Sequence, residues 1–418
     1  MFHCRFGYIV SLCIIVFSIQ VVHADNWPQF RGPGGLGISE AQNLPVTWSE
    51  TENLAWKTAM PGYGSSSPIA LDGKIYVTCY SGYGMGRNRG RMEDLRLHVV
   101  CVDRQTGKIL WDEKIKPILP ESKSVRDHGY AAQTPTTDGE HLYVFFGKSG
   151  VFKLDLNGNQ IWQTSVGTEV HGWGSGTSPV LYENLVIVNA SVESGMLMAI
   201  NKASGEIAWR AEGMERSWNT PHLVKTPNGK DELAVTVKGW IFGFDPKTGK
   251  ELWRCAAIDD YICPSIVSHE GILYALGGRR SKAVAVRSGG RGDVTATHKL
   301  WQADVGANVS SPVVHDGHLY WVSDRIRTAY CLSLSDGSVK YTERIGPQPY
   351  ASILLVDGRF YVVTRTGGTL VLAAKPQFEQ LALNKLDDQS QFNASAIVCD
   401  GTLILRSDEN LYGIKKMN

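Results

Sequence analysis

The chain has 418 residues, and its 42 Lys and Arg against 41 Asp and Glu give a formal net charge of +1. This near-neutral balance excludes a nucleic-acid-binding protein driven by bulk charge, so we expect no nucleic-acid partner. Aromatic residues make up 10% of the chain and there are 44 glycines. Such a composition is typical of many short strands joined by tight turns.

The first 24 residues predict a cleaved signal peptide. Arg5 precedes an apolar run from Tyr8 to Ile19, and Val22-His23-Ala24 fits the small-x-small pattern before a cleavage site. A membrane anchor is the alternative, but the run is short for a span. Cys13 lies inside the run rather than after it, which disfavours a lipoprotein. We therefore expect a periplasmic or secreted protein, cleaved after Ala24, with no transmembrane span in the mature chain.

Residues 25–47 predict a lid segment. Its stretch NWPQFRGPGGLG, from Asn26 to Gly37, is too rich in Gly and Pro for regular structure. We expect Trp27 and Phe30 to pack on the body of the protein. A phosphate-binding loop is disfavoured, because no helix follows the glycines.

Residues 48–418 contain eight copies of one sequence repeat. The unit reads as a small polar residue and Pro, two strands around an Asp-Gly-type turn, a third strand, a Thr-Gly-type turn and an aromatic residue. Asp316, Asp357 and Asp400 hold one position of this unit at spacings of 41 and 43 residues. Periods near this length, with several strands in each unit, predict the blades of a propeller.

The eighth unit stops after three strands. Near the N-terminus, NLAWKTAM (Asn53 to Met60) resembles the closing strand ILWDEKI of the first unit, and no strand precedes it. We expect it to supply the missing outer strand, which closes the ring and leaves no open edge. The sequence therefore predicts an all-β fold, an eight-bladed β-propeller of four-stranded antiparallel blades whose last blade is closed by an N-terminal strand.

A Gly-x-x-x-Trp spacing recurs at the end of the units. It occurs at Gly107/Trp111, Gly158/Trp162, Gly205/Trp209 and Gly249/Trp253. The glycine makes the turn, and we expect the large ring to wedge between neighbouring blades in a structural role. The six cysteines after the signal segment have no CxxC or metal-like spacing, and we expect buried small hydrophobic side chains.

The repeat, as in VDRQTGKILW and FDPKTGKELW, resembles the tryptophan-docking repeat of the PQQ-like (quinoprotein alcohol dehydrogenase-like) β-propellers over roughly residues 48–414. That superfamily includes the quinoprotein alcohol dehydrogenases and the propeller lipoprotein of the outer-membrane barrel-assembly machinery. The resemblance implies the fold, but one fold carries catalysts and scaffolds alike. The dehydrogenases resemble one another in an adjacent Cys-Cys pair and a Glu, Asn and Asp set around calcium. No two cysteines are adjacent here, so PQQ and calcium stay candidate cofactors without a complete motif.

Two sets of loops are expected to meet at one mouth of the central channel. The loops that enter the inner strands carry aromatic and titratable residues, which either plug the channel or form a platform for a flat or sugar-like ligand or an inserted peptide. These residues are Tyr63, His128, Tyr130, His171, Trp173, Arg216, Trp218, Asp259, Asp260, Tyr261 and Tyr350.

The loops after the second strand of most units carry a cation. These cations are Lys148, Lys238, Arg279, Arg325, Arg327, Arg365 and Arg406. Solvated turn residues are the ordinary interpretation. Recurrence at one position favours a ring of positive potential that attracts an anion, and arginines can hold a carboxylate, sulfate or phosphate through paired hydrogen bonds.

We interpret the chain as an exported, monomeric, non-catalytic binding or scaffold protein. Its cationic, aromatic-lined mouth is expected to take an anionic small molecule, a glycan or a partner protein. The alternative is a PQQ-dependent quinoprotein dehydrogenase acting on alcohols or aldose sugars, with Trp173 or Trp218 as the stacking surface for the cofactor.

Overall fold

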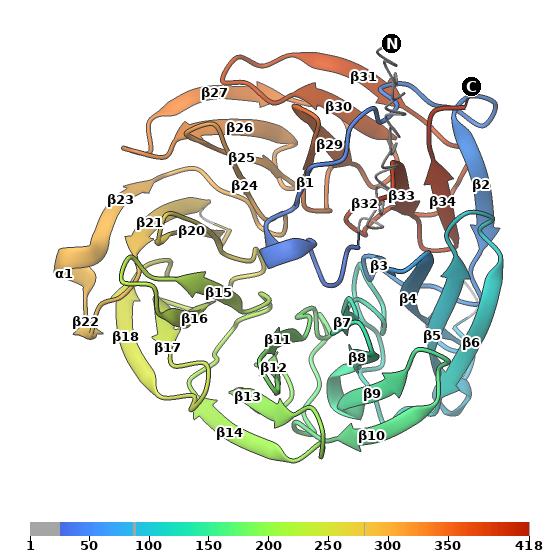
Figure 1. Cartoon of the computed structure of the whole chain (residues 1–418), viewed down its shortest axis with the longest axis horizontal. Helices are drawn as coiled ribbons and strands as arrows, with labels where there is room; N and C mark the ends of the chain where they lie inside the picture. Colours follow the sequence, from blue (N-terminus) through green and yellow to red (C-terminus); the bar gives the residue numbers. More distant parts are fainter. Residues whose placement is uncertain (1–25, 87–88, 280, 418) are drawn as a thin grey trace, which may run out of the picture.

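The computed structural model describes residues 26–86, 89–279 and 281–417, and it is a closed ring of eight β-sheets (Figure 1). Each sheet contains four antiparallel strands, and two of the sheets gain a fifth, peripheral strand. The predicted eight-bladed propeller is thereby confirmed. The predicted signal segment lies outside the described residues. In the part of the chain that is described, no helix has the length and apolarity needed for a membrane span.

The strands follow the chain from the inside of each blade to its rim. The first four blades are β3 (Ile69–Leu71), β4 (Lys74–Ser81), β5 (Arg96–Asp103), β6 (Ile109–Ile115); β7 (Thr136–Thr137), β8 (His141–Phe145), β9 (Val151–Asp155), β10 (Gln160–Thr164); β11 (Val180–Tyr182), β12 (Leu185–Ala190), β13 (Met196–Asn201), β14 (Ile207–Glu212); and β15 (His222–Lys225), β16 (Asp231–Val237), β17 (Trp240–Phe244), β18 (Glu251–Ala256).

The next three blades are β19 (Val267–His269), β20 (Ile272–Gly277), β21 (Lys282–Arg287), β23 (Lys299–Ala303); β24 (Val313–His315), β25 (His318–Ser323), β26 (Thr328–Ser333), β27 (Val339–Arg344); and β28 (Leu354–Val356), β29 (Arg359–Val363), β30 (Thr369–Ala373), β31 (Gln380–Asn384). The peripheral strands are β1 (Ile38–Ser39) beside β28 and β22 (Gly292–Asp293) beside β18, and the short helices are η1 (Pro33–Gly35), η2 (Met92–Asp94), η3 (Gly147–Ser149) and α1 (Thr295–His298).

The last blade joins the two ends of the propeller sequence. It contains β32 (Ile397–Cys399), β33 (Thr402–Arg406) and β34 (Asn410–Ile414), and its outer strand is β2 (Leu54–Ala59). β2 runs antiparallel to β34, with Leu54 opposite Ile414 and Ala59 opposite Asn410. The predicted closure by an N-terminal strand is confirmed.

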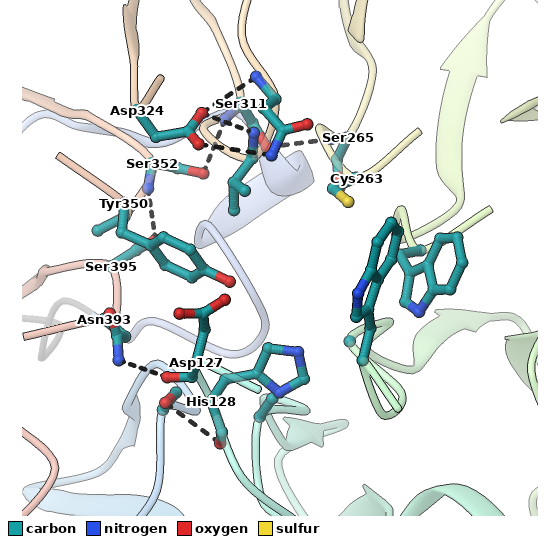
Figure 2. A pocket seen from close by; sticks show the side chains of 18 of the residues that line it. Asp127, His128, Cys263, Ser265, Ser311, Asp324, Tyr350, Ser352, Asn393 and Ser395 are labelled. Carbon is teal, nitrogen blue, oxygen red and sulfur yellow. Dashed lines mark hydrogen bonds between the residues drawn. The ribbon is translucent and has the colours of Figure 1, made fainter. Parts of the chain in front are cut away.

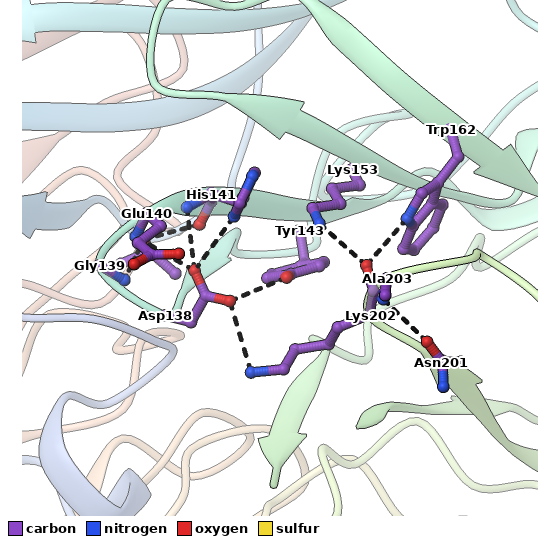
Figure 3. A network of polar contacts seen from close by, with 11 residues as sticks. Asp138, Gly139, Glu140, His141, Tyr143, Lys153, Trp162, Asn201, Lys202 and Ala203 are labelled. Atoms are coloured by element: carbon purple, nitrogen blue, oxygen red, sulfur yellow. Dashed lines mark hydrogen bonds and ion pairs between the residues drawn. The ribbon is translucent and has the colours of Figure 1, made fainter. Parts of the chain in front are cut away.

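Five repeated tryptophans each fasten their blade to the next one. Trp162 of the second blade donates its indole N–H to the carbonyl oxygen of Lys202 in the third at 3.1 Å, and the Lys153 ammonium donates to the same oxygen at 2.9 Å (Figure 3). Trp56, Trp111, Trp209 and Trp301 make the corresponding bond to the turn of their own neighbour. The wedge that the spacing predicts is therefore confirmed for these blades.

Trp253 departs from the pattern. Its indole N–H donates to Glu232 of the same blade at 2.7 Å. The segment that carries β22 and α1 packs on this blade, and Arg291 from that segment also bonds to Glu232 at 3.0 Å. The insertion before β23 thus takes the place of the usual docking turn beside Trp253.

Candidate functional site

A closed belt of hydroxyl groups surrounds the channel. In each blade, the backbone N–H of a small polar residue at the start of the inner strand donates to the side-chain hydroxyl of its counterpart in the next blade. The eight bonds are all 3.0–3.1 Å long and run through Ser67, Thr134, Ser178, Thr220, Ser265, Ser311, Ser352, Ser395 and back to Ser67. The belt holds the inner ends of the blades at one radius. It also explains the small polar residue that opens each repeat.

The N-terminal segment closes one end of the channel. The backbone N–H groups of Thr137 and Leu355, which follow the belt along their strands, donate to Pro28 and Gly37 at 2.9 Å. The guanidinium of Arg31 donates to the carbonyl of Pro312, and η1 lies at the centre of the ring (Figure 1). The channel is therefore blind, with the segment at one end and the loops that precede the belt at the other.

A cavity of about 460 Å³ occupies the loop end of the channel. Seven of the eight belt residues line it, and Phe30 of the N-terminal segment also lines it. Figure 2 shows Asp127, His128 and Tyr350 around the same space as Ser265, Ser352 and Cys263. The cavity is within the size range of small-molecule sites.

One side of the cavity is an aromatic wall made of Trp173, Trp218 and Tyr261. The ring centroids of Trp173 and Tyr261 are 4.8 Å apart, and those of Trp173 and Trp218 are 5.2 Å apart. Trp218 is fixed by its indole N–H, which donates to the Gly174 carbonyl at 2.8 Å. Because the rings are tilted or edge-on to one another, the wall is a rigid packed cluster.

Two arginines of the predicted cation ring line the cavity and have different partners. The Arg279 guanidinium lies 5.8 Å from the Trp173 ring centroid and 5.2 Å from that of Tyr261, and it forms no ion pair with a described carboxylate. Arg365 lies 4.7 Å from the Tyr350 ring and donates to Asp127 at 3.0 Å. Arg279 is therefore open to a ligand, whereas Arg365 already binds a carboxylate.

Burial changes the pKa of other groups that line the cavity. Burial raises the pKa of the Cys263 thiol to about 12 and lowers the pKa of His128. Burial also raises the pKa of Asp324, although its carboxylate accepts the backbone N–H groups of Asn308 and Val309. Among the described lining residues, no nucleophile is hydrogen-bonded to a general base, which is the arrangement that covalent catalysis needs.

The structure brings together only part of the predicted site. Trp173, Trp218, Tyr261, Tyr350, His128, Arg279 and Arg365 line the cavity. His171 and Arg216 line a groove on the outer side of the aromatic wall. Tyr130 and Lys148 line a separate small pocket, where they donate to the carbonyls of Ser122 and Pro120. Tyr63 lines a fourth hollow, where its hydroxyl donates to Glu409.

The other predicted cations lie apart from the cavity. Arg406 is 1% exposed, and its guanidinium donates to the backbone oxygens of Ser66 and Thr78, where it joins the last blade to the first. Lys238, Arg325 and Arg327 are exposed at the rim and do not line the cavity. Asp260 accepts the backbone N–H groups of Tyr261 and Arg279, so it shapes the loop without reaching the cavity. The continuous cation ring that the sequence predicts is thus reduced at the cavity to separate arginines.

Sequence reasoning missed several lining residues. Arg126 and Asp127 come from the long connection between β6 and β7, which no repeat position marks. Asn308, Gln348 and Asn393 precede the belt in their blades. The small polar residue of each repeat was a usable signal, because its recurrence before the inner strand indicates a shared role at the axis.

The residues of the cavity do not fit a calcium-held quinone. Asp127 is bound to Arg365, and Asp324 is bound to backbone N–H groups. Within the described ranges no three His, Cys, Asp or Glu side chains form a group that could hold a metal ion. Calcium prefers six to eight oxygen ligands with several carboxylates, and this donor set does not provide them.

Comparison with known proteins identifies the family. A family model described as "Outer membrane protein assembly factor BamB" matches residues 96–343 and 237–415, and the chain belongs to this family. A BamB of Yersinia pestis is 28% identical over 76% of this chain and 80% of its own. A quinoprotein ethanol dehydrogenase of Pseudomonas aeruginosa is 23% identical over 69% of this chain but 46% of the enzyme. The resemblance to PQQ-like propellers is confirmed.

The fold is shared with solved structures. A quinohemoprotein alcohol dehydrogenase from Comamonas testosteroni superimposes with a TM-score of 0.66 at 12% identity, over 94% of this chain and 81% of that one. At this identity the likeness extends to the fold alone. Both scaffolds and dehydrogenases therefore stand among the relatives, and the site has to distinguish them.

Proposed function

We propose that this protein is an exported, non-catalytic binding propeller whose blind cavity takes the anionic part of a ligand or partner. The observation that carries the proposal is the Arg279 guanidinium, which lines the cavity against Trp173 and Tyr261 with no described carboxylate to neutralise it. Arg279 is solvent-exposed at the mouth, so its charge attracts an anion from solution with a strength that salt screens. The relatives named as assembly factors support a binding role.

The charges of the residues that line the cavity also favour an anionic ligand. Arg126, Arg279 and Arg365 line it, against Asp127 and Asp324. One carboxylate is paired with Arg365, and burial raises the pKa of the other. The net field at the cavity is therefore positive although the whole chain is near neutral.

The experiment measures binding of anionic probes by isothermal titration calorimetry at low and moderate salt. The probes are a sulfated disaccharide, a tetraglutamate peptide and PQQ with and without calcium, with maltose as the neutral probe. We expect at least one anionic probe to bind, and Arg279→Gln to weaken it by about tenfold, which corresponds to one lost charge-assisted contact. Higher salt should weaken binding further.

Arg210→Gln is the matched control, since Arg210 is an exposed cation on the rim strand β14. Equal affinities for wild type and Arg279→Gln, or no binding by any anionic probe, would overturn the proposal. Calcium-dependent PQQ binding accompanied by dye reduction with an alcohol would instead support the dehydrogenase alternative.

A further inference from the structure

A groove of about 430 Å³ lies on the outer side of the aromatic wall. Trp173, Trp218, Tyr261 and Arg279 line both the groove and the central cavity, so the wall separates two compartments. Arg216 lines only the groove, and Arg126 lines only the cavity. Substitution of Arg216 or of Arg126 therefore alters one compartment alone, whereas substitution of a shared residue alters both.

The groove combines apolar sides with cationic groups. Val170 and Val192 line it together with the two indoles, and Val170 is 40% exposed, so its apolar side chain is accessible to a ligand. Its two cations are Arg216 and Arg279. No Asp or Glu is found among the described residues that line it. A ligand that matches this groove therefore has an apolar body and one or two negative charges.

Arg216 is held in a restricted backbone conformation. Its φ is +50°, in the left-handed region that long side chains seldom adopt. The carbonyl of Arg216 accepts the Ile262 N–H at 3.0 Å, and Trp218 N–H donates to the Ile262 carbonyl at 2.7 Å. These bonds fix the backbone beside the groove. The Arg216 side chain is exposed and forms no hydrogen bond or ion pair with any described side chain. Strained backbone positions cluster at binding and active sites.

We infer that the groove binds a carboxylate carried on an apolar group, of the size of one or two amino acids. Arg216 and Arg279 hold the carboxylate, and Val170, Val192 and the Trp173 ring cover the apolar part. Arginine suits this task because its planar guanidinium donates two parallel hydrogen bonds to a carboxylate. The inference extends the proposed function of the mouth to a second compartment, which shares Arg279 and the aromatic wall with the cavity.

The test titrates N-acetyl-L-phenylalanine into the protein and follows tryptophan fluorescence and heat. N-acetyl-L-phenylalaninamide lacks the charge, and acetate lacks the apolar group. We expect the acid to bind at least tenfold more tightly than either. Arg216→Asn should weaken the acid about tenfold, and Asn suits this substitution because it tolerates positive φ.

Arg126→Gln serves as the matched control, because it alters only the central cavity. It should leave the affinity for N-acetyl-L-phenylalanine unchanged while weakening the anionic probes of the cavity. Weaker binding of N-acetyl-L-phenylalanine by Arg126→Gln but not by Arg216→Asn, or equal binding of the acid and its amide, would overturn the groove site and leave the cavity proposal intact. If none of the anionic probes of the cavity binds while N-acetyl-L-phenylalanine still does, the proposed function is overturned and the groove site stays intact.

Two sources of this chemistry can be separated with longer probes. An N-acetyl tetrapeptide that ends in phenylalanine should bind more tightly than the single residue if the natural ligand is the C-terminus of a polypeptide. Equal affinity would assign a free small carboxylate. Either result supports the site, provided that Arg216→Asn weakens both probes.

Discussion

Replacement of one belt hydroxyl tests whether the ring at the axis stabilises the propeller. Ser352 accepts the backbone N–H of Ser311 at 3.0 Å, and both residues are buried. Ser352→Ala leaves this N–H without a partner in the interior. A buried donor without an acceptor costs about 1–3 kcal/mol. We expect the free energy of unfolding to fall by about 1 kcal/mol, the lower end of this range, because Ser311 and Ser352 line the cavity and water there can partly replace the lost acceptor.

The assay is equilibrium urea unfolding followed by tryptophan fluorescence. Ser352→Thr is the control, because Thr134 and Thr220 occupy the same position in other blades. The threonine variant should stay within about 0.5 kcal/mol of wild type, with an unchanged denaturant slope. If the alanine variant is as stable as the threonine variant, the belt does not contribute to stability as argued.

Three other perturbations test separate contacts. Arg406→Met removes the donors to Ser66 and Thr78 and should lower the free energy of unfolding by about 2–4 kcal/mol in the same assay; a smaller change would mean that blade closure does not depend on it. Gly249→Ala places a Cβ 2.3 Å from the Trp209 ring at φ +69° and should cost more than Gly239→Ala, whose φ is also positive but whose Cβ meets no atom within 4 Å; equal thermal shifts would contradict this. Burial raises the pKa of Glu193 from 4.5 to about 7, so its stabilising contribution is complete below pH 4.5 and is lost as the pH rises through about 7. Glu193→Gln should therefore flatten the pH dependence of stability in this window and stabilise the protein at pH 8 by about 1–3 kcal/mol, and an unchanged pH profile would refute the assignment.

The fold could be predicted because the same local pattern is repeated. An Asp-Gly turn, a Thr-Gly turn and a tryptophan fix three strands and their order in one repeat, and the recurrence excludes most alternatives. Even the closing strand could be placed, since NLAWKTAM carries the outer-strand pattern without strands before it. Trp253 shows the limit of this reasoning. Trp209 and Trp253 share the Gly-x-x-x-Trp spacing, but an insertion in the next blade gives Trp253 a different neighbour.

The site was predicted less completely, because it depends on where long side chains point. Arg279 follows β20 and lines the cavity, whereas Arg406 is the last residue of β33 and turns inward to buried carbonyl oxygens. The grouping of both as loop cations overlooked their different distances from the preceding turn, nine residues from Glu270 to Arg279 and six from Asp400 to Arg406. Asp127 could not be predicted for another reason. It lies in a connection outside the repeated units, and its partner Arg365 is 238 residues away.

The pairing of β2 with β34 has a consequence for how the protein is made. Because Leu54 pairs with Ile414, the last blade has its four strands only after Ile414 has been synthesised. The belt is likewise incomplete until Ser395 donates to Ser67, 328 residues earlier in the chain. A partial chain on the ribosome therefore exposes two unpaired sheet edges, and such edges invite association with other chains. Contacts between positions so far apart also slow folding. We therefore expect an unusual dependence on chaperones during synthesis, followed by a product whose two ends protect one another.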